Sequence, residues 1–512
     1  MPAVRRRGFR VLPTMTESEF QALADAGYNR IALVSQAFAD LDTPLSLYLK
    51  LSEGGTARNT FLLESVVGGE RFGRYSFIGL AAHTELRVKD GVTRVLRDGV
   101  EVERSEQAPL AFIEAWRARF KVALPQGMPR FCGGLAGYFG YDSVRYMEPR
   151  LQESARRHPL PDPLDMPDIL LLQSEELAVI DNLAGRLSFI VYADPAQPDA
   201  FVRANRRLRE LHDSLRASVA PPAMPPAEVT AVEHEFEHAD YLRAVHRAKE
   251  LIAAGDFMQV QVGQRLRKRF EQSPLSLYRA LRSLNPSPYM YFYNFGDFQV
   301  VGSSPEILVR QEATADGRKV TIRPLAGTRP RGDTDEADLR NERELLADPK
   351  ERAEHLMLID LARNDLGRIA RIGSVKVTEA FAIERYSHVM HIVSNVEGLL
   401  RDGLGALDVL RATFPAGTLS GAPKIRAMEV IDELEPTRRG LYGGAVGYWS
   451  FAGDMDLAIA IRTGIVKSGW LYVQAAAGVV ADSVPEMEWR ETQAKARALL
   501  RAAEQVQQGF DS

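Results

Sequence analysis

Short apolar segments with strand character recur along the whole chain, and helices fall between them without regular alternation. Such segments cover residues 178–181, 187–192, 290–295, 298–302, 320–323, 444–450, 457–466 and 470–477. Some are joined by very short turns, such as the one at Asn294-Phe295-Gly296-Asp297, a pattern typical of antiparallel hairpins. Because a parallel sheet needs a long crossover between successive strands, the pattern predicts an α+β fold of largely antiparallel sheet with flanking helices.

A proline-rich segment divides the chain. Residues 218–230 hold four prolines and no helical or strand periodicity, and they lie between helical patterns over 201–218 and 238–256. Such a composition is typical of a linker or an exposed connection. We therefore predict two domains, 1–225 and 226–512.

The two parts share a sequence word, which indicates that they are related halves. PLSLY occurs at Pro44–Tyr48 and again at Pro274–Tyr278, and each copy is followed by a strand-like segment, RYSFIG ending at Gly79 and DFQVVG ending at Gly302. A five-residue match also arises by coincidence, so this is a hypothesis of internal duplication. Only the second copy runs on into an acidic residue, Glu306, which predicts that the first half is a structural or regulatory partner.

Composition excludes several classes of function. The 512 residues carry a net charge of −4, which gives no electrostatic footprint for nucleic-acid binding. No apolar run reaches the roughly 18–20 residues of a membrane span, and we expect a cytoplasmic protein. The single cysteine, Cys132, lies in an apolar glycine-rich run and is expected to be a small buried side chain rather than a nucleophile.

Two pairs of glutamates constrain the chemistry. Glu351 and Glu354 lie three residues apart at the start of one predicted helix, and Glu488 and Glu491 do the same in another. Residues three apart share a helix face, so each pair presents two carboxylates together. A solvated helix surface is the ordinary explanation of one such pair. If the two pairs meet, they form an oxygen-only site suited to Mg²⁺.

Several shorter motifs in the C-terminal half combine small residues with polar ones. Gly327 and Thr328 lie in a turn after a predicted strand, where a ligand can approach the backbone. Thr418 precedes LSGAPK and a helix whose first amides can face an anion. His391 lies in an apolar stretch, and Arg462 is charged among apolar residues of a predicted strand. A core histidine and a structural salt bridge are the plain alternatives; proton transfer and carboxylate binding are the functional ones.

Taken together, these segments resemble chorismate-utilising enzymes. PLAGTRPRG, EHLMLIDLARNDLGR, the histidine segment, GTLSGAPK, YGGAVGY and ADSVPEMEWRET occur in the order typical of that family, over residues 235–505. LLES at 62–65 and NPSPYMYF at 285–292 extend the resemblance to the anthranilate-forming branch across nearly the whole chain. This implies the chorismate-utilising fold, with a regulatory N-terminal domain, a catalytic C-terminal domain, and a lyase reaction that converts chorismate and ammonia to anthranilate and pyruvate, the first step of tryptophan biosynthesis.

The resemblance also assigns roles to individual residues. Glu354 and Glu491, with Glu351 and Glu488 close by, are expected to hold Mg²⁺. Glu306 is the expected general acid and His391 the expected base, with Thr418 beside them. The expected substrate-binding residues are Gly327, Thr328, Tyr442, Arg462, Ala476, Ala477 and Gly478. The substrate-binding segment is commonly Gly-Ala-Gly in this family, whereas this chain has Ala476 at its first position.

Two positions distinguish this branch from its relatives. Family members that use water as nucleophile resemble one another in an activating lysine, and the matching position here is Gln259. Aminodeoxychorismate synthases typically carry a lysine nucleophile where this chain has Ala326. Neither glutamine nor alanine can serve those roles, which favours direct attack by ammonia. An aminodeoxychorismate synthase and a non-catalytic amino-acid-binding regulatory protein remain the alternatives.

Partners and control follow from the same resemblance. Cys132, the only cysteine, has no nucleophile context for glutamine hydrolysis, so ammonia is expected from a separate glutamine amidotransferase subunit in a hetero-oligomer. L-Tryptophan is expected as an allosteric feedback inhibitor. The residues expected to bind it are Glu64, Ser65, Asn285, Pro288, Tyr289 and Met290.

Overall fold

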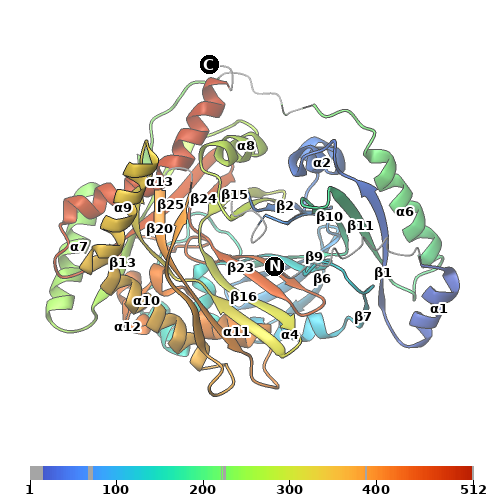
Figure 1. Cartoon of the computed structure of the whole chain (residues 1–512), viewed down its shortest axis with the longest axis horizontal. Coiled ribbons are helices and arrows are strands. Elements are labelled where there is room, and N and C mark those ends of the chain that lie inside the picture. Colours follow the sequence, from blue (N-terminus) through green and yellow to red (C-terminus); the bar gives the residue numbers. More distant parts are fainter. Residues whose placement is uncertain (1–14, 67–72, 221, 223–226, 387–388, 510–512) are drawn as a thin grey trace.

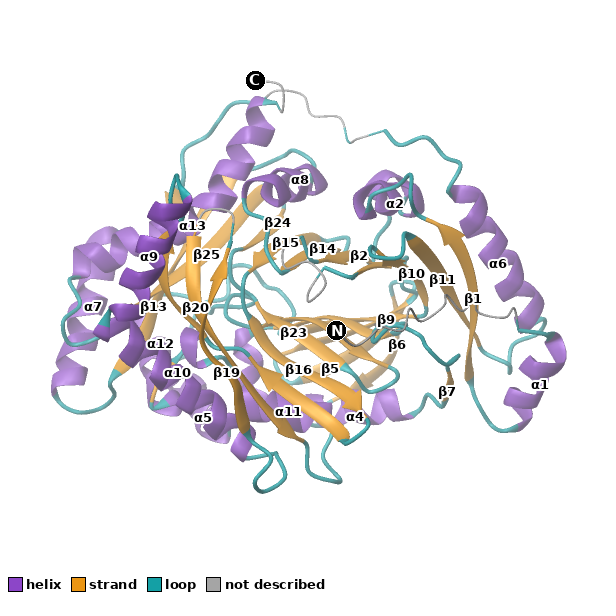
Figure 2. Cartoon of the chain, viewed as in Figure 1, coloured by secondary structure: helices purple, strands orange, loops and turns teal. Residues whose placement is uncertain are grey.

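The computed structural model describes residues 15–66, 73–220, 222, 227–386 and 389–509. Within them the chain forms two large sheets, which lie face to face between outer helices (Figures 1 and 2). Nearly all strand pairs are antiparallel; β1 and β7 form a parallel pair. The predicted α+β fold with largely antiparallel sheet and flanking helices is confirmed.

The first sheet, here called sheet A, contains strands from both ends of the chain. Its order is β12 (Glu233–His234), β13 (Gln259–Arg269), β25 (Trp470–Val479), β24 (Thr463–Lys467), β15 (Phe298–Ser304), β14 (Tyr289–Asn294), β2 (Thr60–Glu64), β3 (Tyr75–Gly79), β10 (Glu176–Asp181), β11 (Arg186–Ala193), β1 (Arg30–Phe38) and β7 (Val122–Ala123), with β21 (Gly421–Ala422) paired to β13.

The second sheet, sheet B, is built in the same way. Its order is β18 (Leu325–Pro330), β20 (Val389–Leu399), β17 (Gly317–Ile322), β16 (Ile307–Thr314), β23 (Met455–Ile459), β22 (Ala445–Ser450), β8 (Gly134–Phe139), β9 (Ile169–Ser174), β4 (Thr84–Lys89), β5 (Val92–Arg97) and β6 (Val100–Ser105), with β19 (Lys376–Arg385) paired to β20.

Helices cover the outer faces of both sheets (Figure 2). They are α1 (Glu17–Asp25), α2 (Pro44–Leu51), α4 (Pro109–Ala118), α5 (Pro149–Arg157), α6 (Ala200–Ser214), α7 (His238–Ala253), α8 (Pro274–Leu284), α9 (Asp335–Ala347), α10 (Pro349–Gly367), α11 (Ala406–Thr413), α12 (Lys424–Leu434) and α13 (Pro485–Gln508), with short 3₁₀ turns η1 (Glu53–Gly55), η2 (Tyr141–Tyr146) and η3 (Gly417–Leu419). No helix of the described residues combines the length and apolarity that a membrane crossing requires.

Alternating side chains on the strands build separate cores on the two faces of each sheet. On β14, Met290 and Phe292 pack with the helices that cover sheet A, whereas Tyr291 and Tyr293 belong to the core between the sheets. Successive strand residues point to opposite faces, so one segment serves both cores. The apolar character of the sequence on both faces follows from this double burial.

The two halves of the chain are joined inside the sheets. In sheet A, β2 pairs with β14, with Glu64 opposite Met290, and in sheet B, β8 pairs with β22. The predicted boundary at residue 225 lies outside the described residues, and the division into domains 1–225 and 226–512 stays a prediction. Both sheets nevertheless continue from the first half into the second.

One local expectation is wrong. The segment 457–466 is two strands rather than one, because β23 lies in sheet B and β24 in sheet A, and Arg462 lies in the break between them.

A buried ion pair links the C-terminal strands to the helices beside them. Arg439 donates to Glu435 at 2.6 Å and 2.9 Å, and the two side chains are 1% and 2% exposed. Glu435 also accepts from the Gly263 amide on β13 at 2.7 Å, and Arg439 donates to the Leu419 carbonyl of η3 at 2.7 Å. Every polar atom that leaves water therefore gains a partner, which makes the pair tolerable in the interior.

Removing one member of this pair is expected to destabilise the protein strongly. In Glu435→Ala the Arg439 charge stays buried without its partner, and we expect the free energy of unfolding to fall by about 3–5 kcal/mol. Urea unfolding followed by circular dichroism measures this change. The control is Glu250→Ala, which removes an exposed ion pair with Arg247 and should change stability by no more than about 0.5 kcal/mol. Equal decreases in the free energy of unfolding of the two variants would contradict a stabilising role for the buried Glu435–Arg439 pair.

Candidate active site

Arg462 lies where the chain crosses from sheet B to sheet A. Its backbone adopts a positive φ of 49°, a conformation that non-glycine residues rarely take. The guanidinium is partly buried, and burial lowers its pKa. Within the described residues it forms no salt bridge, although Glu306 and Tyr386 lie within electrostatic range. The structural salt bridge considered from sequence is therefore absent from the described residues, and the cation is left facing the site.

Glu306 follows β15 and is buried, with 8% of its surface exposed. Burial raises the pKa of its carboxyl group to about 8, and a hydrogen bond from Thr418 opposes this rise. That hydrogen bond is long, with 3.4 Å between the Thr418 hydroxyl and Oε1. A cavity of about 400 Å³ adjoins Glu306 and is lined largely by apolar side chains from α10 and its surroundings, including Leu358 and Leu361. At neutral pH this carboxyl group holds a proton that it can donate.

His391, on β20, is held by a neighbouring strand. Its Nδ1 lies 2.9 Å from the Gly327 carbonyl and 3.1 Å from the Thr328 hydroxyl. A carbonyl can only accept, so Nδ1 carries the proton and Nε2 has the lone pair. Nε2 is buried and has no hydrogen-bond partner in the described structure. Burial lowers the pKa of His391, which keeps the ring neutral and able to accept a proton.

The segment Ala476–Gly478 lies on β25, next to Tyr442 and Gln259. Burial raises the pKa of the Tyr442 hydroxyl, and a hydrogen bond from the Ala476 backbone opposes this. A Cβ atom added to Gly478 would lie 2.8 Å from the Gln259 side-chain nitrogen. The glycine therefore permits a close approach between the strand and that side chain, and it places Gln259 beside the expected substrate segment.

The four glutamates lie on two helices, Glu351 and Glu354 on α10 and Glu488 and Glu491 on α13. Burial raises the pKa of Glu354, and the nearby charges of Glu351 and Glu491 raise it further. Burial also raises the pKa of Glu488; a hydrogen bond from Ser483 opposes this, and the Glu491 charge adds to it. The charge of Glu491 on α13 thus acts on Glu354 on α10, and the convergence of all four glutamates stays a prediction.

Basic side chains compensate part of this negative charge. Lys495 pairs with Glu491 at 2.8 Å, and Arg329 pairs with Glu351 at 3.2 Å. In the described part of the chain no group of three or more His, Cys, Asp or Glu side chains is close enough to hold a metal as it stands. The donor set itself, four carboxylates and no soft ligand, fits a hard cation such as Mg²⁺.

Comparisons with known proteins identify the family of this chain. A family model described as chorismate binding enzyme matches residues 58–501. The chain belongs to the chorismate-binding enzyme family. It is 56% identical to anthranilate synthase component 1 of Neisseria meningitidis serogroup A over 97% of this chain and 100% of that protein, and 57% identical to that of Pseudomonas aeruginosa over 97% and 100%. These similarities place it in the anthranilate synthase component 1 group, a lyase acting on chorismate in the first step of tryptophan biosynthesis.

Solved structures of the family share the fold. The crystal structure of anthranilate synthase component I from Streptococcus pneumoniae TIGR4 is similar with a TM-score of 0.73 and 36% identity, covering 85% of this chain and 94% of that chain. The menaquinone-specific isochorismate synthase from Escherichia coli is similar in fold, with a TM-score of 0.69 at 18% identity, covering 95% of this chain and 100% of that chain. The resemblance stated from sequence is thereby confirmed.

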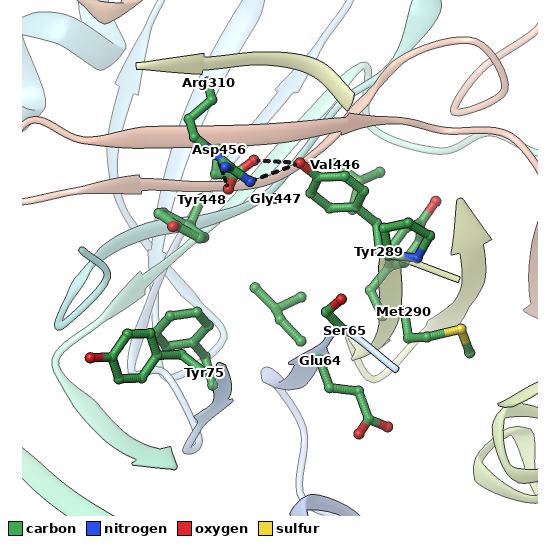
Figure 3. A pocket seen from close by; sticks show the side chains of 14 residues that line it. Glu64, Ser65, Tyr75, Tyr289, Met290, Arg310, Val446, Gly447, Tyr448 and Asp456 are labelled. Carbon is green, nitrogen blue, oxygen red and sulfur yellow. Dashed lines mark hydrogen bonds and ion pairs between the residues drawn. The ribbon is translucent and has the colours of Figure 1, made fainter. Parts of the chain in front are cut away.

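This member of the family has a second cavity, of about 550 Å³, between the two sheets (Figure 3). Ser65, Pro288, Tyr289 and Met290 line it, together with Leu63, Glu64, Tyr75, Phe77, Tyr291, Arg310, Val446, Gly447, Tyr448 and Asp456. One wall is polar: Tyr289 donates to Asp456 at 3.1 Å, and Arg310 pairs with Asp456 at 2.8 Å. The cavity therefore combines aromatic walls with one charged corner.

Two of the residues expected to bind tryptophan are engaged elsewhere. The Glu64 carboxylate points away from the cavity in Figure 3 and accepts from Tyr278 at 2.5 Å and Arg282 at 2.7 Å. Asn285 does not line the cavity; its side-chain amide donates to Ser303 at 3.0 Å. The Glu64 carboxylate thus binds α8 although the residue lines the cavity, and Asn285 lies beside the segment that carries Pro288, Tyr289 and Met290.

Several residues of these two sites were not anticipated from sequence. Lys495 donates to the Ala476 carbonyl at 2.8 Å as well as pairing with Glu491, and its position four residues after Glu491 was a usable signal. The Tyr386 ring lies 5.5 Å from the His391 ring. Arg310 and Asp456 meet from strands far apart in the sequence, so no local pattern could have paired them.

The pKa of Glu306 predicts a specific pH dependence of stability. The folded protein keeps this proton up to about pH 8, whereas the unfolded chain loses it near the ordinary value of 4.5. Folding therefore takes up a proton in this window, and the contribution of Glu306 to stability falls as pH rises through it. Glutamine does not titrate, so Glu306→Gln does not lose stability in this way as pH rises. The free energy of unfolding of the variant minus that of the parent should therefore increase by roughly 1 kcal/mol per pH unit between pH 5 and pH 8.

Urea unfolding at a series of pH values measures this difference. Glu250→Gln, at an exposed position, is the matched control and should show no such trend. A constant difference between Glu306→Gln and the parent across this range would show that the carboxyl group is already ionised in the folded protein.

Proposed function

We propose that this chain forms anthranilate by adding ammonia to C2 of chorismate with loss of the C4 hydroxyl group, followed by elimination of pyruvate. The observation that carries the proposal is Arg462, a partly buried cation without a salt bridge in the described residues, within electrostatic range of both Glu306 and His391. A ligand carboxylate would supply its missing partner, and the guanidinium fork binds carboxylates in two-point contact.

The substrate would lie between β25, the β18 turn and the crossing at Arg462. Tyr442 and the backbone of Ala476, Ala477 and Gly478 would contact one carboxylate, and the Gly327–Thr328 turn would bind the other. Gly327 adopts a φ of +70°, which leaves its backbone accessible without the strain a side chain would add. Several fixed donors would orient the ring before any bond changes.

Two proton transfers follow from the charge states of the site. As ammonia bonds to C2 and the bond between C4 and oxygen breaks, Glu306 would give its proton to the leaving hydroxyl group, which departs as water. Thr418 would hold the carboxyl group in place through its hydrogen bond. His391 would then take the C2 proton at Nε2 as the enolpyruvyl group leaves and becomes pyruvate, which restores the aromatic ring.

The four glutamates fit a magnesium ion at this site. Glu354 and Glu491 would hold it, with Glu351 and Glu488 beside them. When bound, the ion supplies electrostatic stabilisation and orientation to a substrate carboxylate. Lys495 and Arg329, which neutralise the acids in the metal-free chain, would release them for binding.

The nucleophile is ammonia because the chain lacks the groups that the alternatives need. Gln259 lies beside Gly478 but cannot deprotonate water, and Ala326 has no amine to attack the ring. Cys132 is buried and burial raises its pKa to about 11, so it is no nucleophile for glutamine hydrolysis. We therefore infer a separate amidotransferase subunit as the ammonia source in a cytoplasmic hetero-oligomer.

The direct test supplies purified chain with chorismate, ammonium and Mg²⁺. We expect anthranilate fluorescence and one equivalent of pyruvate, and loss of both when EDTA removes the metal. An aminodeoxychorismate synthase would consume chorismate without releasing pyruvate, which would refute the proposal. Glu491→Gln should lower turnover by at least about 100-fold. The matched control is Glu486→Gln, an acid of the same first helical turns that pairs with His238, and its turnover should equal the parent's.

The cavity between the sheets would bind tryptophan as a feedback inhibitor. Its aromatic and apolar walls suit an indole ring, and Ser65 with the Pro288–Met290 backbone would contact the amino-acid group. Because strands of both sheets line it, occupancy can favour one arrangement of the sheets over another. Inhibition requires that this arrangement bind chorismate more weakly.

Filling the cavity should remove the inhibition without removing activity. In Ser65→Arg the longer side chain would occupy the tryptophan volume, and we expect half-inhibition to need at least about tenfold more tryptophan, with turnover at the parent's level. Val66→Arg, which places the same charge on an exposed neighbour, is the control and should remain inhibited. Equal inhibition of Ser65→Arg and the parent would refute the placement of tryptophan here.

A further inference from the structure

The two halves of each sheet have the same strand connectivity, which allows positions to be matched between them. In sheet A the order β14, β15, β24, β25, β13 on one side repeats as β2, β3, β10, β11, β1 on the other. A matched backbone contact fixes the register: the Ser303 amide donates to the Arg462 carbonyl and the Leu80 amide donates to the Glu176 carbonyl, both at 3.1 Å. Glu176 therefore occupies in the first half the place that Arg462 occupies in the second.

The helix after the matched strands extends the comparison. α13 follows β25 and α6 follows β11. Counting from Pro485, the fourth and seventh residues of α13 are Glu488 and Glu491, and counting from Ala200, the same positions of α6 are Arg203 and Arg206. Each glutamate of the candidate metal site thus has an arginine as its counterpart.

The side chain that pairs with the second of these residues also has opposite charge on the two helices. Glu491 pairs with Lys495 four residues later at 2.8 Å, and Arg206 pairs with Glu210 four residues later at 3.9 Å. With Glu176 in place of Arg462, all four charged positions have changed sign between the halves. Two arginines in place of two carboxylates repel a divalent cation, so any ligand at this place in the first half would have different chemistry from a metal ion.

A polar cavity of about 840 Å³ lies at this place in the first half, between α6 and the ends of β10 and β11. Residues 192–194 of its wall match residues 476–478, the expected substrate segment of the second half. The cavity is therefore the structural counterpart of the part of the candidate active site that lies between β25 and α13.

Charge is unevenly distributed across this cavity. Glu175, Glu176 and Asp194 are at most 30% exposed and form what is here called the floor. Arg30 pairs with Glu175 at 2.5 Å and with Asp194 at 3.2 Å, and Arg207 pairs with Glu176 at 2.8 Å. At the rim Arg206 is 66% exposed, and Arg203 is exposed and forms no ion pair within the described part of the chain. The floor thus holds three carboxylates against two guanidinium groups, and the rim holds Arg203 and Arg206 against the carboxylate of Glu210.

We propose that this cavity is a second ligand site, which binds a small zwitterion with its ammonium group toward Glu176 and Asp194 and its carboxylate on Arg203 and Arg206. Both the reversed charges and the separation of floor from rim select a ligand with one cationic and one anionic end. The α-amino acids are the simplest class with that chemistry, and the polar wall favours a small or polar side chain.

The test titrates the full chain by calorimetry with each proteinogenic L-amino acid except tryptophan. We expect at least one to bind the parent, and binding to be weakened at least about tenfold in the double variant Arg203→Gln/Arg206→Gln. Arg209→Gln, an exposed arginine of the same helix outside the cavity, is the matched control and should bind as the parent does. All substituted residues are at the surface of α6, so folding should be preserved.

Two analogues of the best ligand separate a zwitterion site from a simple ion site. The analogue without the amine and the analogue without the carboxylate should each bind at least about tenfold more weakly than the amino acid. Equal binding of the amine-free analogue would reveal a plain anion site and overturn the proposal. Absence of binding by every amino acid, or binding that the double variant leaves unchanged, would also overturn it. The readout is affinity rather than turnover, so its outcome is independent of the proposed reaction.

Discussion

Backbone hydrogen bonds between β2 and β14, and between β8 and β22, carry both sheets without interruption from one half of the chain into the other. Every site in the molecule is placed relative to these two junctions. The candidate active site and the charge-reversed cavity lie on opposite sides of them, and the cavity of Figure 3 lies between the sheets where the halves meet. The two related halves therefore form one continuous pair of sheets with three separate cavities.

Removal from water sets the working charge states of the active site. The same cause, burial, keeps Glu306 protonated and His391 neutral, because in each case the charged form loses hydration that the protein does not replace. Arg462 stays charged without a salt bridge in the described residues, which leaves it ready for a ligand carboxylate. The protonated carboxyl group of Glu306 and the neutral imidazole of His391 thus both lie within electrostatic range of the Arg462 guanidinium.

The fold class and the acidic residues of the candidate site could be predicted from sequence, because both depend on the pattern of residues within short segments. Strand periodicity and short turns predicted antiparallel sheets, and the spacing of Glu351 with Glu354 predicted a shared helix face. The crossing at Arg462 was not predicted, because residues 457–466 are mostly apolar on both sides of it. Two short strands in different sheets then give the same sequence pattern as one long strand. The pairing of Arg310 with Asp456 depends on strand order in sheet B, which no short stretch of sequence encodes.

The two halves share their strand order but differ at matched charged positions. Glu176 in the first half, for example, matches Arg462 in the second, so the two positions carry opposite charges.

The junctions between the halves have a mechanical consequence. Swinging the two halves apart would break two ladders of peptide hydrogen bonds at once, so this molecule has no hinge at its midline. A signal from the cavity between the sheets must travel as shear, with the outer helices sliding by small amounts over a sheet that stays intact. Because α10 and α13 each carry two of the four glutamates, such sliding would change how the carboxylates of the two pairs lie relative to one another.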